Sequence, residues 1–300
     1  MRSRGRSAWP RDSVYSARRM VARIAEEEDK VGFLMARLLW ASRLCRLITF
    51  QLPDGYRMRF YPSSASTAFW LDRHFRPADS TLLRRYLRPG ATFVDVGANV
   101  GYLSLLAWTR VGPAGRVVAI EAHPRTYRFL AGNVALNGFG VDTHNVAIGR
   151  QPGELFFTSL RSDDQNRAIP ESEARRSGVR VAVTTLDRLL GGTDVDLLKV
   201  DTEGFEVHVL EGATETLKRC RALYIEDSER NLRRYGRSSR DLRQALRDAG
   251  FVPFRIVGDR ALAADAATDR RDGQGAENLF AVKHEAADEL LRRGGLTRAA

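Results

Sequence analysis

Residues 91–122 read ATFVDVGANVGYLSLLAWTRVGPAGRVVAIEA. An apolar run stops at a glycine-rich turn, residues 97–101, and a helical pattern follows to about residue 110. A second apolar run begins at residue 116 and ends on Glu121. The order of strand, tight turn, helix and second strand predicts a nucleotide-type pocket at the carboxyl edge of a parallel sheet.

Apolar runs and helical patterns keep alternating after this stretch, which predicts parallel strands joined by helices. Among the predicted elements, strands are expected at residues 92–96, 141–148 and 195–200, and helices at residues 124–137 and 206–220. The last two apolar runs, residues 251–257 and 278–283, have no helical pattern between them, so we expect them to pair antiparallel. The predicted fold class is α/β: a Rossmann-like fold with a doubly wound, mainly parallel, seven-stranded sheet and a C-terminal antiparallel hairpin. Residues 161–178 are polar and irregular, and we expect them to form a loop or lid.

Three segments are predicted along the chain. Residues 1–90 form an N-terminal extension with a disordered start, an amphipathic helix, a β-hairpin and further helices. Residues 91–284 form the pocket domain, and residues 285–300 form a C-terminal tail. The formal net charge is +11, yet residues 1–90 hold 18 of the 48 basic residues and only 8 of the 37 acidic ones. The rest of the chain is nearly neutral, so we expect no nucleic-acid partner.

A helical pattern over residues 31–48 places one set of apolar residues on one face: Val31, Leu34, Met35, Leu38, Cys45 and Ile48. In the interpretation that we favour, this helix docks on the core or on a second copy of the chain, which would form a homo-oligomer. The alternative is a basic amphipathic helix at a membrane surface. Three arginines interrupt the stretch, so we expect no transmembrane segment.

The two cysteines, Cys45 and Cys220, show no pairing signature, and residues 1–30 lack the apolar region of a secretory signal. Both features favour a reducing compartment, and we expect a cytoplasmic protein.

An acid, Asp95, stands two residues before the first glycine of the turn. It would repel a pyrophosphate, and the turn lacks the Gly-x-Gly-x-x-Gly spacing of dinucleotide sites. An acid there suits a ligand with an amino group or a sulfonium, and Glu121 is placed to bind a ribose diol. These features favour S-adenosylmethionine over a nicotinamide cofactor. The predicted cofactor-binding residues are Asp95, Gly97, Ala98, Asn99, Gly101, Ser104, Glu121, Ala122 and Asn145.

Four blocks of the chain resemble the FkbM-type family of S-adenosylmethionine-dependent methyltransferases. They are VDVGANVGYLS at residues 94–104, residues 118–137 with their IEAHP motif, TTLDRLL running into DLLKVDTEGFEVHVLEG at residues 184–212, and NLFAV at residues 278–282. The resemblance spans roughly residues 92–283 and implies that residues 91–284 are a methyltransferase domain. It also implies methyl transfer to oxygen, typically to a hydroxyl of a sugar or specialised metabolite. The acceptor is then a small molecule, in some members a glycosylated one.

A second motif, KVDTEGFE at residues 199–206, lies where the predicted fourth parallel strand meets its helix. In this architecture the acceptor is expected there, and a base would help to remove the proton of an alcohol. The candidate catalytic residues are Asp201 first, then Glu203 and Lys199, and last His208. Structural roles stay open for each: an ion pair of Lys199 with Asp201, a dipole-complementing acid at Glu203 and a packed surface histidine at His208.

Asp201 and Glu226, with the adjacent Asp227, offer oxygen ligands for a divalent cation. In the family that the chain resembles, a histidine often follows the strand-end acid by two residues, and Ser228 stands there instead. We therefore expect no metal requirement.

Three other function classes fit the sequence less well. A nucleic-acid methyltransferase is disfavoured because the chain has no Asn/Asp-Pro-Pro-aromatic motif and no Pro-Cys nucleophile. A nicotinamide oxidoreductase is disfavoured by the turn. A non-catalytic cofactor-binding module would be expected to have a degraded pocket, and the pocket residues look intact.

Overall fold

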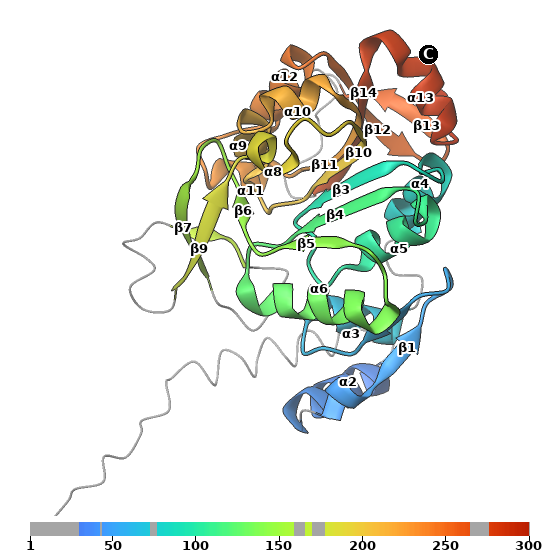
Figure 1. Ribbon diagram of the computed structural model, residues 1–300, viewed down its shortest axis with the longest axis vertical. Helices are drawn as coiled ribbons and strands as arrows, with labels where there is room; N and C mark the ends of the chain where they lie inside the picture. The colour runs from blue at the N-terminus through green and yellow to red at the C-terminus, as the bar shows by residue number, and fades with distance from the viewer. Residues whose placement is uncertain are drawn as a thin grey trace, which may run out of the picture.

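The computed structural model describes residues 30–42, 44–72, 77–158, 166–169, 178–264 and 276–299 (Figure 1). The predicted disordered start and most of the predicted loop over residues 161–178 lie outside these ranges.

The central sheet has nine strands in the described part of the chain. Their order is β15 (Thr297–Arg298), β13 (Arg260–Ala263), β12 (Phe251–Val257), β14 (Glu277–Lys283), β11 (Cys220–Asp227), β10 (Val195–Val200), β3 (Thr92–Val96), β4 (Arg116–Ile120) and β5 (Asp142–His144). The strands from β11 to β5 are parallel, whereas β14 is antiparallel to both β11 and β12. The predicted Rossmann-like fold is confirmed, and β13 and β15 extend the expected seven strands at one edge.

Helices cover both faces of this sheet (Figure 1). Because side chains alternate between the faces, Phe93 belongs to one core and the next residue, Val94, to the other. The first core is covered by α4 (Pro77–Tyr86), α5 (Tyr102–Val111), α6 (Pro124–Asn137) and α13 (Ala287–Arg293). The second is covered by α8 (Leu186–Leu190), α9 (Glu206–Glu211), α10 (Thr214–Lys218), α11 (Glu229–Arg233) and α12 (Ser239–Asp248). The carboxyl ends of β3, β4, β10 and β11 therefore meet at one edge between the helix layers.

Two elements expected to be continuous are broken. The chain leaves the central sheet after β5, so the single strand predicted over residues 141–148 was wrong. Its second half is β6 (Ala147–Ile148) of another sheet, which also contains β9 (Gly178–Thr184), β7 (Gly153–Thr158) and β8 (Ala168–Ile169). The single helix predicted over residues 206–220 is α9 followed by α10. It breaks at Gly212, where a Cβ would lie 2.0 Å from the carbonyl oxygen of Gly149.

The N-terminal extension contains α2 (Lys30–Ser42), a 3-10 helix (Leu44–Leu47), the strands β1 (Thr49–Gln51) and β2 (Arg57–Arg59), and α3 (Ser64–Leu71). The strands β1 and β2 pair antiparallel, which confirms the predicted hairpin. The predicted packing of α2 on the core was wrong for Val31, Leu34, Met35 and Leu38, which are exposed. The helix packs through its other side instead, where Phe33 and Ala36 are buried.

Two asparagines of α6 hold this extension against the rest of the protein. The Asn137 side chain accepts a hydrogen bond from the backbone N–H of Arg57 and donates one to its carbonyl, each at 2.7 Å. One turn earlier, Asn133 accepts from the N–H of Arg59 at 2.9 Å and donates to the carbonyl of Val100 at 2.8 Å. Asn133 is fully buried. Its side chain therefore joins the strand β2 to the glycine turn from a position without solvent contact.

We predict that Asn133→Ala lowers the free energy of unfolding by about 2–5 kcal/mol, because one buried and one part-buried backbone group lose their partners. Asn137→Ala is the matched control. Its hydrogen bonds are exposed, so water replaces them and the loss should be about 1 kcal/mol. Urea denaturation of both variants measures the difference, and equal losses would contradict the role given to Asn133.

Candidate functional site

The glycine turn lies against the ends of two neighbouring strands. The backbone N–H groups of Gly97 and Ala98 both donate to the carbonyl of Ile120 in β4, each at 2.9 Å. On the other side, a Cβ on Gly97 would lie 1.9 Å from the carbonyl oxygen of Asp201, directly after β10. The φ of Gly97 is +81°, so both the conformation and the space require glycine. The turn therefore brings the predicted cofactor residues next to the predicted catalytic motif.

Glu121 closes the turn from the β4 side. Its carboxylate accepts backbone hydrogen bonds from Asn99 at 3.0 Å and from His123 at 2.9 Å. The side chain of Asn145 donates to the carbonyls of Glu121 and Ala122, each at 2.9 Å. These contacts hold the half-buried Glu121 beside the turn. A carboxylate oxygen can accept more than one hydrogen bond, so the chemistry of Glu121 also suits a ligand hydroxyl.

Lys199 is a buried cation between β3 and β10. Its Nζ lies 3.0 Å from Asp95 Oδ1, donates to the carbonyl of Gly97 at 3.0 Å and lies 3.8 Å from Asp201 Oδ2. The hydroxyl of Ser104 donates to the other oxygen of Asp95 at 2.6 Å. One ammonium group thus contacts the strand, the turn and the catalytic motif.

The structure does not place Asp95 where we predicted, facing the amino group of a ligand. Asp95 is fully buried, and its carboxylate is held by Lys199 and Ser104. The reason lies in the sheet register, in which Asp95 of β3 pairs with Lys199 of β10, so their side chains share a face. Asp95 and Ser104 therefore help to fix the conformation of the turn from within the buried core and do not face a ligand.

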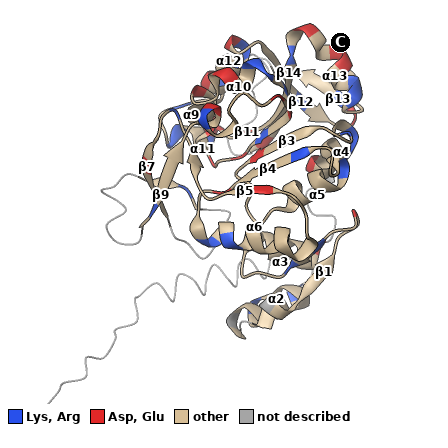
Figure 2. Ribbon diagram, viewed as in Figure 1, with Lys and Arg blue, Asp and Glu red and all other residues tan. Residues whose placement is uncertain are grey.

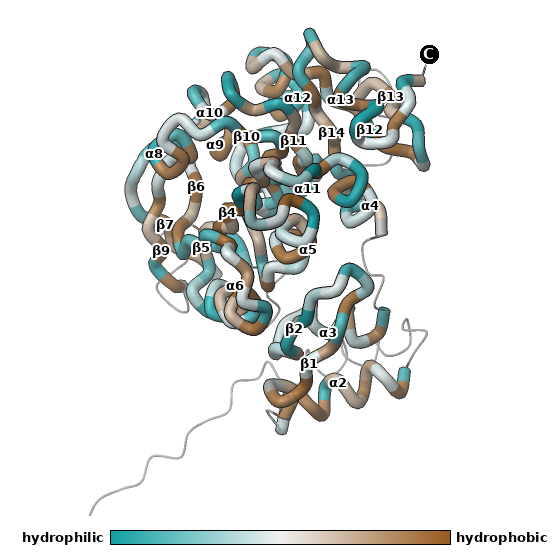
Figure 3. Tube along the Cα trace, turned by 45° about the vertical axis from the view of Figure 1, so that its right-hand side comes forward, coloured by the Kyte–Doolittle hydropathy of each residue, from teal (hydrophilic) through white to brown (hydrophobic). Residues whose placement is uncertain are grey.

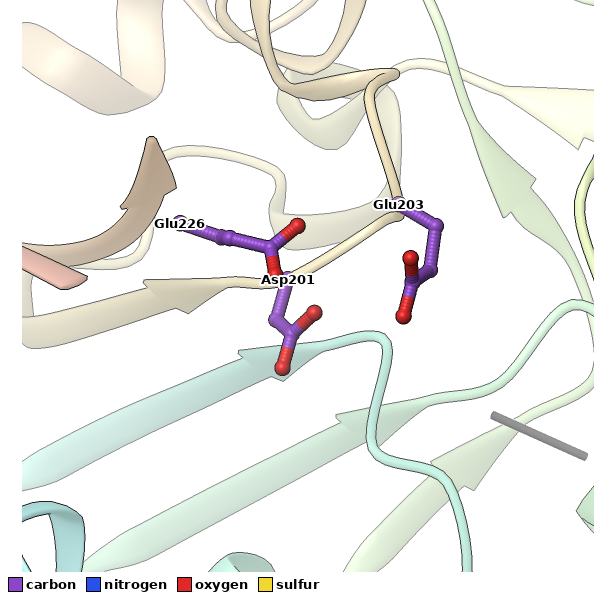
Figure 4. Close-up of side chains that lie close together, drawn as sticks. All are labelled: Asp201, Glu203 and Glu226. Atoms are coloured by element: carbon purple, nitrogen blue, oxygen red, sulfur yellow. The ribbon is translucent and has the colours of Figure 1, made fainter. Parts of the chain in front are cut away.

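Three carboxylates from two strand ends point towards one another (Figure 4). Asp201 directly follows β10, Glu203 stands in the next turn, and Glu226 belongs to β11. An oxygen atom from each lies within 4.8 Å of those from the other two. Like charges at this separation require compensation, so the surroundings of this carboxylate cluster decide its charge.

A proton on Glu226 and the side-chain amide of Asn231 offset the negative charge of the carboxylate cluster. Burial, followed by the negative charges of Asp201 and Glu203, raises the pKa of Glu226 to about 9. Glu226 therefore carries a proton at neutral pH. The Nδ2 of Asn231 donates to Glu203 at 2.9 Å and to Glu226 at 3.4 Å. The cluster thus presents a proton donor beside proton acceptors, an arrangement typical of proton-transfer sites.

Glu206 holds the turn that carries Glu203. It is buried, and one of its oxygens accepts from the N–H groups of Thr202 at 2.8 Å and Gly204 at 3.1 Å. Burial raises the pKa of Glu206. Glu203 itself has a φ of +57°, which is uncommon outside glycine. The hydrogen bonds to Glu206 support this conformation, in which the Glu203 side chain points into the cluster (Figure 4).

His208 and Asp227 lie outside the carboxylate cluster. The ring of His208 stacks on Phe205 with centroids 4.3 Å apart and lines a hollow of about 350 Å³ with Arg150. Burial lowers the pKa of His208, as expected for a packed ring. Asp227 faces the opposite side of β11 and forms a buried ion pair with Arg243 at 2.8 Å. His208 as a base and Asp227 as a metal ligand therefore find no support in the geometry.

Sequence reasoning missed Asn231 and the turn-holding role of Glu206. The one sequence feature that could have indicated Asn231 is its position five residues after Glu226, the acid at the end of a strand. The short helix α11 begins at Glu229 and turns the chain back, so the amide of Asn231 lies beside Glu226 at the end of β11.

The raised pKa of Glu226 predicts how stability depends on pH. The ordinary pKa of 4.5 rises to about 9 in the folded protein, so the folded state holds a proton that the unfolded state has lost. The contribution of this group is fully present below about pH 4.5 and is lost as pH rises through about 9. Urea denaturation across this range should show Glu226→Gln losing less stability with rising pH than the wild type. Glu154→Gln is the control, because Glu154 is exposed. Parallel curves for Glu226→Gln and the wild type would refute the protonated cluster.

Comparison with known proteins bears on this site. Residues 95–253 match the family model of the methyltransferase FkbM domain, more than half of the 300-residue chain. The chain is 32% identical over 142 residues to Methyltransferase 1 of Beauveria bassiana (strain ARSEF 2860), covering 40% of this chain and 57% of that protein. It is 30% identical over 156 residues to Methyltransferase sdnD of Sordaria araneosa, covering 41% of this chain and 60% of that protein. The chain thus spans less than two thirds of either relative.

Among solved structures, methyltransferase FkbM from Methylobacillus flagellatus KT is 14% identical with a TM-score of 0.40, over 73% of this chain and 54% of that one. The fibrillarin of Aeropyrum pernix is 16% identical with a TM-score of 0.41, over 78% of this chain and 82% of that one. The family model matches more than half of the chain, and this match assigns the family. This chain belongs to the FkbM methyltransferase family.

Proposed function

We propose that this protein is an S-adenosylmethionine-dependent O-methyltransferase that acts on a hydroxyl group of a small molecule. The observation that carries the proposal is the meeting of the glycine turn, Glu121 and the carboxylate cluster at one sheet edge. Family membership supports methyl transfer. Cys45 and Cys220 are both buried as thiols, which is consistent with a protein that acts in a reducing compartment.

The cofactor is proposed to lie along the glycine turn. Gly97 allows close approach of the backbone, and Glu121 would accept hydrogen bonds from the ribose hydroxyls. Ala98, Asn99 and Ala122 flank these two residues. Gly101 serves packing, because a Cβ there would lie 2.6 Å from the side chain of Leu130. Asp95, Ser104 and Asn145 act indirectly, by holding the turn and the loop after β4.

Bound S-adenosylmethionine supplies an electrophilic methyl group. An acceptor hydroxyl that took this methyl group would have to give up its proton to a base. Asp201 is the proposed proton acceptor, because its backbone is the part of the carboxylate cluster that lies directly against Gly97 of the glycine turn. Its backbone donates to β3 at 3.0 Å, and its carboxylate lies 3.8 Å from the ammonium of Lys199. Lys199 thereby places a positive charge beside Asp201 and helps to orient its carboxylate.

The other two acids suit an acceptor with several hydroxyl groups. The protonated Glu226 can donate a hydrogen bond, and Glu203 can accept one. A sugar or other polyhydroxylated metabolite offers donors and acceptors on adjacent carbons that match this pattern. An anionic acceptor would be repelled by the cluster.

A divalent cation is the alternative way to neutralise the cluster. The donor set fits such an ion, since Asp201, Glu203 and Glu226 each offer a carboxylate oxygen. However, Asn231 directs an N–H group at two of these acids, a donor that a cation would have to displace. We therefore propose that the proton on Glu226 and the amide of Asn231 offset the charge of the cluster without a metal ion.

We predict that Asp201→Asn lowers turnover by about 10²–10⁴-fold while S-adenosylmethionine still binds, because the amide cannot take the hydroxyl proton. Turnover is measured as S-adenosylhomocysteine release with a panel of sugar glycosides as acceptors, with and without a chelator. Binding is measured by calorimetry.

Glu121→Ala is the matched control at the other end of the site. It should weaken S-adenosylmethionine binding by about tenfold through lost hydrogen bonds. Near-normal turnover of Asp201→Asn would remove its role as base. Unchanged affinity of Glu121→Ala would remove the ribose assignment, and loss of wild-type turnover with the chelator would favour the metal.

A further inference from the structure

An apolar stripe runs along the outer side of α2, at the end of the molecule opposite α12 (Figure 3). Val31 and Leu38 are each 69% exposed, and Leu34 and Met35 are 45% and 48% exposed. These positions recur at the spacing of one helix face. The following 3-10 helix continues the stripe with two further exposed residues, Leu44 and Leu47. We call these six residues the outer stripe.

The outer stripe is not the remnant of a failed core contact, because α2 is already anchored on its other side. Phe33 and Ala36 are buried there, and the indole N–H of Trp70 donates to the carbonyl of Gly32 at 3.1 Å. Elsewhere in the described part of the chain, Val257 alone is a comparably exposed large hydrophobic residue. A continuous apolar surface on an otherwise well-packed protein marks a binding surface.

Positive charge accompanies the outer stripe. Residues 30–47 contain four basic residues and no acidic one, and Figure 2 shows no acidic residue on α2. Over residues 1–47 there are 11 basic and 5 acidic residues. An exposed apolar face combined with surplus positive charge is the means by which amphipathic segments bind anionic bilayers.

We propose that α2 and the following 3-10 helix attach this protein to the surface of anionic phospholipid bilayers, with the outer stripe inserted among the lipids. A bilayer offers an apolar layer for the leucines and negative charge for the arginines. A second copy of the chain would bring two identical positive segments face to face, where like charges oppose pairing. No helix in the described ranges is long and apolar enough to cross a membrane, so the contact is peripheral.

The test is co-sedimentation of the full chain with vesicles. One set contains phosphatidylcholine alone, and the other contains equal parts of phosphatidylcholine and phosphatidylglycerol. We expect about tenfold stronger partitioning onto the anionic vesicles, weakened by added salt. The double variant Leu34→Gln/Leu38→Gln should lose about tenfold in partitioning, since it removes two inserted side chains and leaves the core untouched. Val257→Gln is the control, because it removes an exposed hydrophobic residue elsewhere and should change nothing.

Three results would overturn the proposal. Equal binding to both vesicle types would remove the role of charge. Full binding by the double leucine variant would assign the affinity to the arginines of residues 1–29 instead of the outer stripe. A dimer in light scattering that the double variant dissociates would make a second copy the occupant of this surface.

Discussion

The site depends on one buried ion pair between adjacent strands. Lys199 and Asp95 occupy paired positions on β10 and β3, so their side chains meet on one face of the sheet. Loss of one partner from such a pair typically costs about 3–5 kcal/mol, because a buried charge is left uncompensated. Here the same ammonium also binds the carbonyl of Gly97 and approaches Asp201. One ammonium group therefore joins the glycine turn to the motif that carries Asp201, although 102 residues separate Lys199 from Gly97.

Charge is divided across the sheet edge. On the β3 side, Lys199 neutralises Asp95, and Glu121 is held by backbone N–H groups. On the β11 side, the carboxylate cluster relies on a proton and on the amide of Asn231. The first arrangement is rigid and suits a cofactor that binds in one conformation. The second retains a movable proton, which suits the methyl transfer to a hydroxyl group that we propose.

Local sequence signals predicted much of the fold. The strands at residues 92–96 and 195–200 and the helix at residues 124–137 match β3, β10 and α6. Apolar runs mark the two strands, and Pro124 at its first position and Gly138 at its C-cap mark the helix. The sequence also placed Glu121 and Asp201 at the same edge. Contacts between residues far apart in the sequence could not be predicted from local patterns. The partner of Asp95 depends on strand order, and the break at Gly212 depends on its approach to the backbone of Gly149. The periodicity of α2 could not distinguish a buried apolar face from an exposed one.

Lys199 joins the glycine turn, where we propose that the cofactor binds, to Asp201, the proposed base, and this coupling can be measured. Calorimetric titration of Lys199→Met with S-adenosylhomocysteine tests it most directly, with Lys218→Met as control, because Lys218 is exposed. Circular dichroism of each variant establishes that it is folded. The coupling predicts at least about tenfold weaker binding for Lys199→Met, since the turn loses its anchor, and unchanged binding for Lys218→Met. Wild-type affinity in a folded Lys199→Met protein would contradict the coupling.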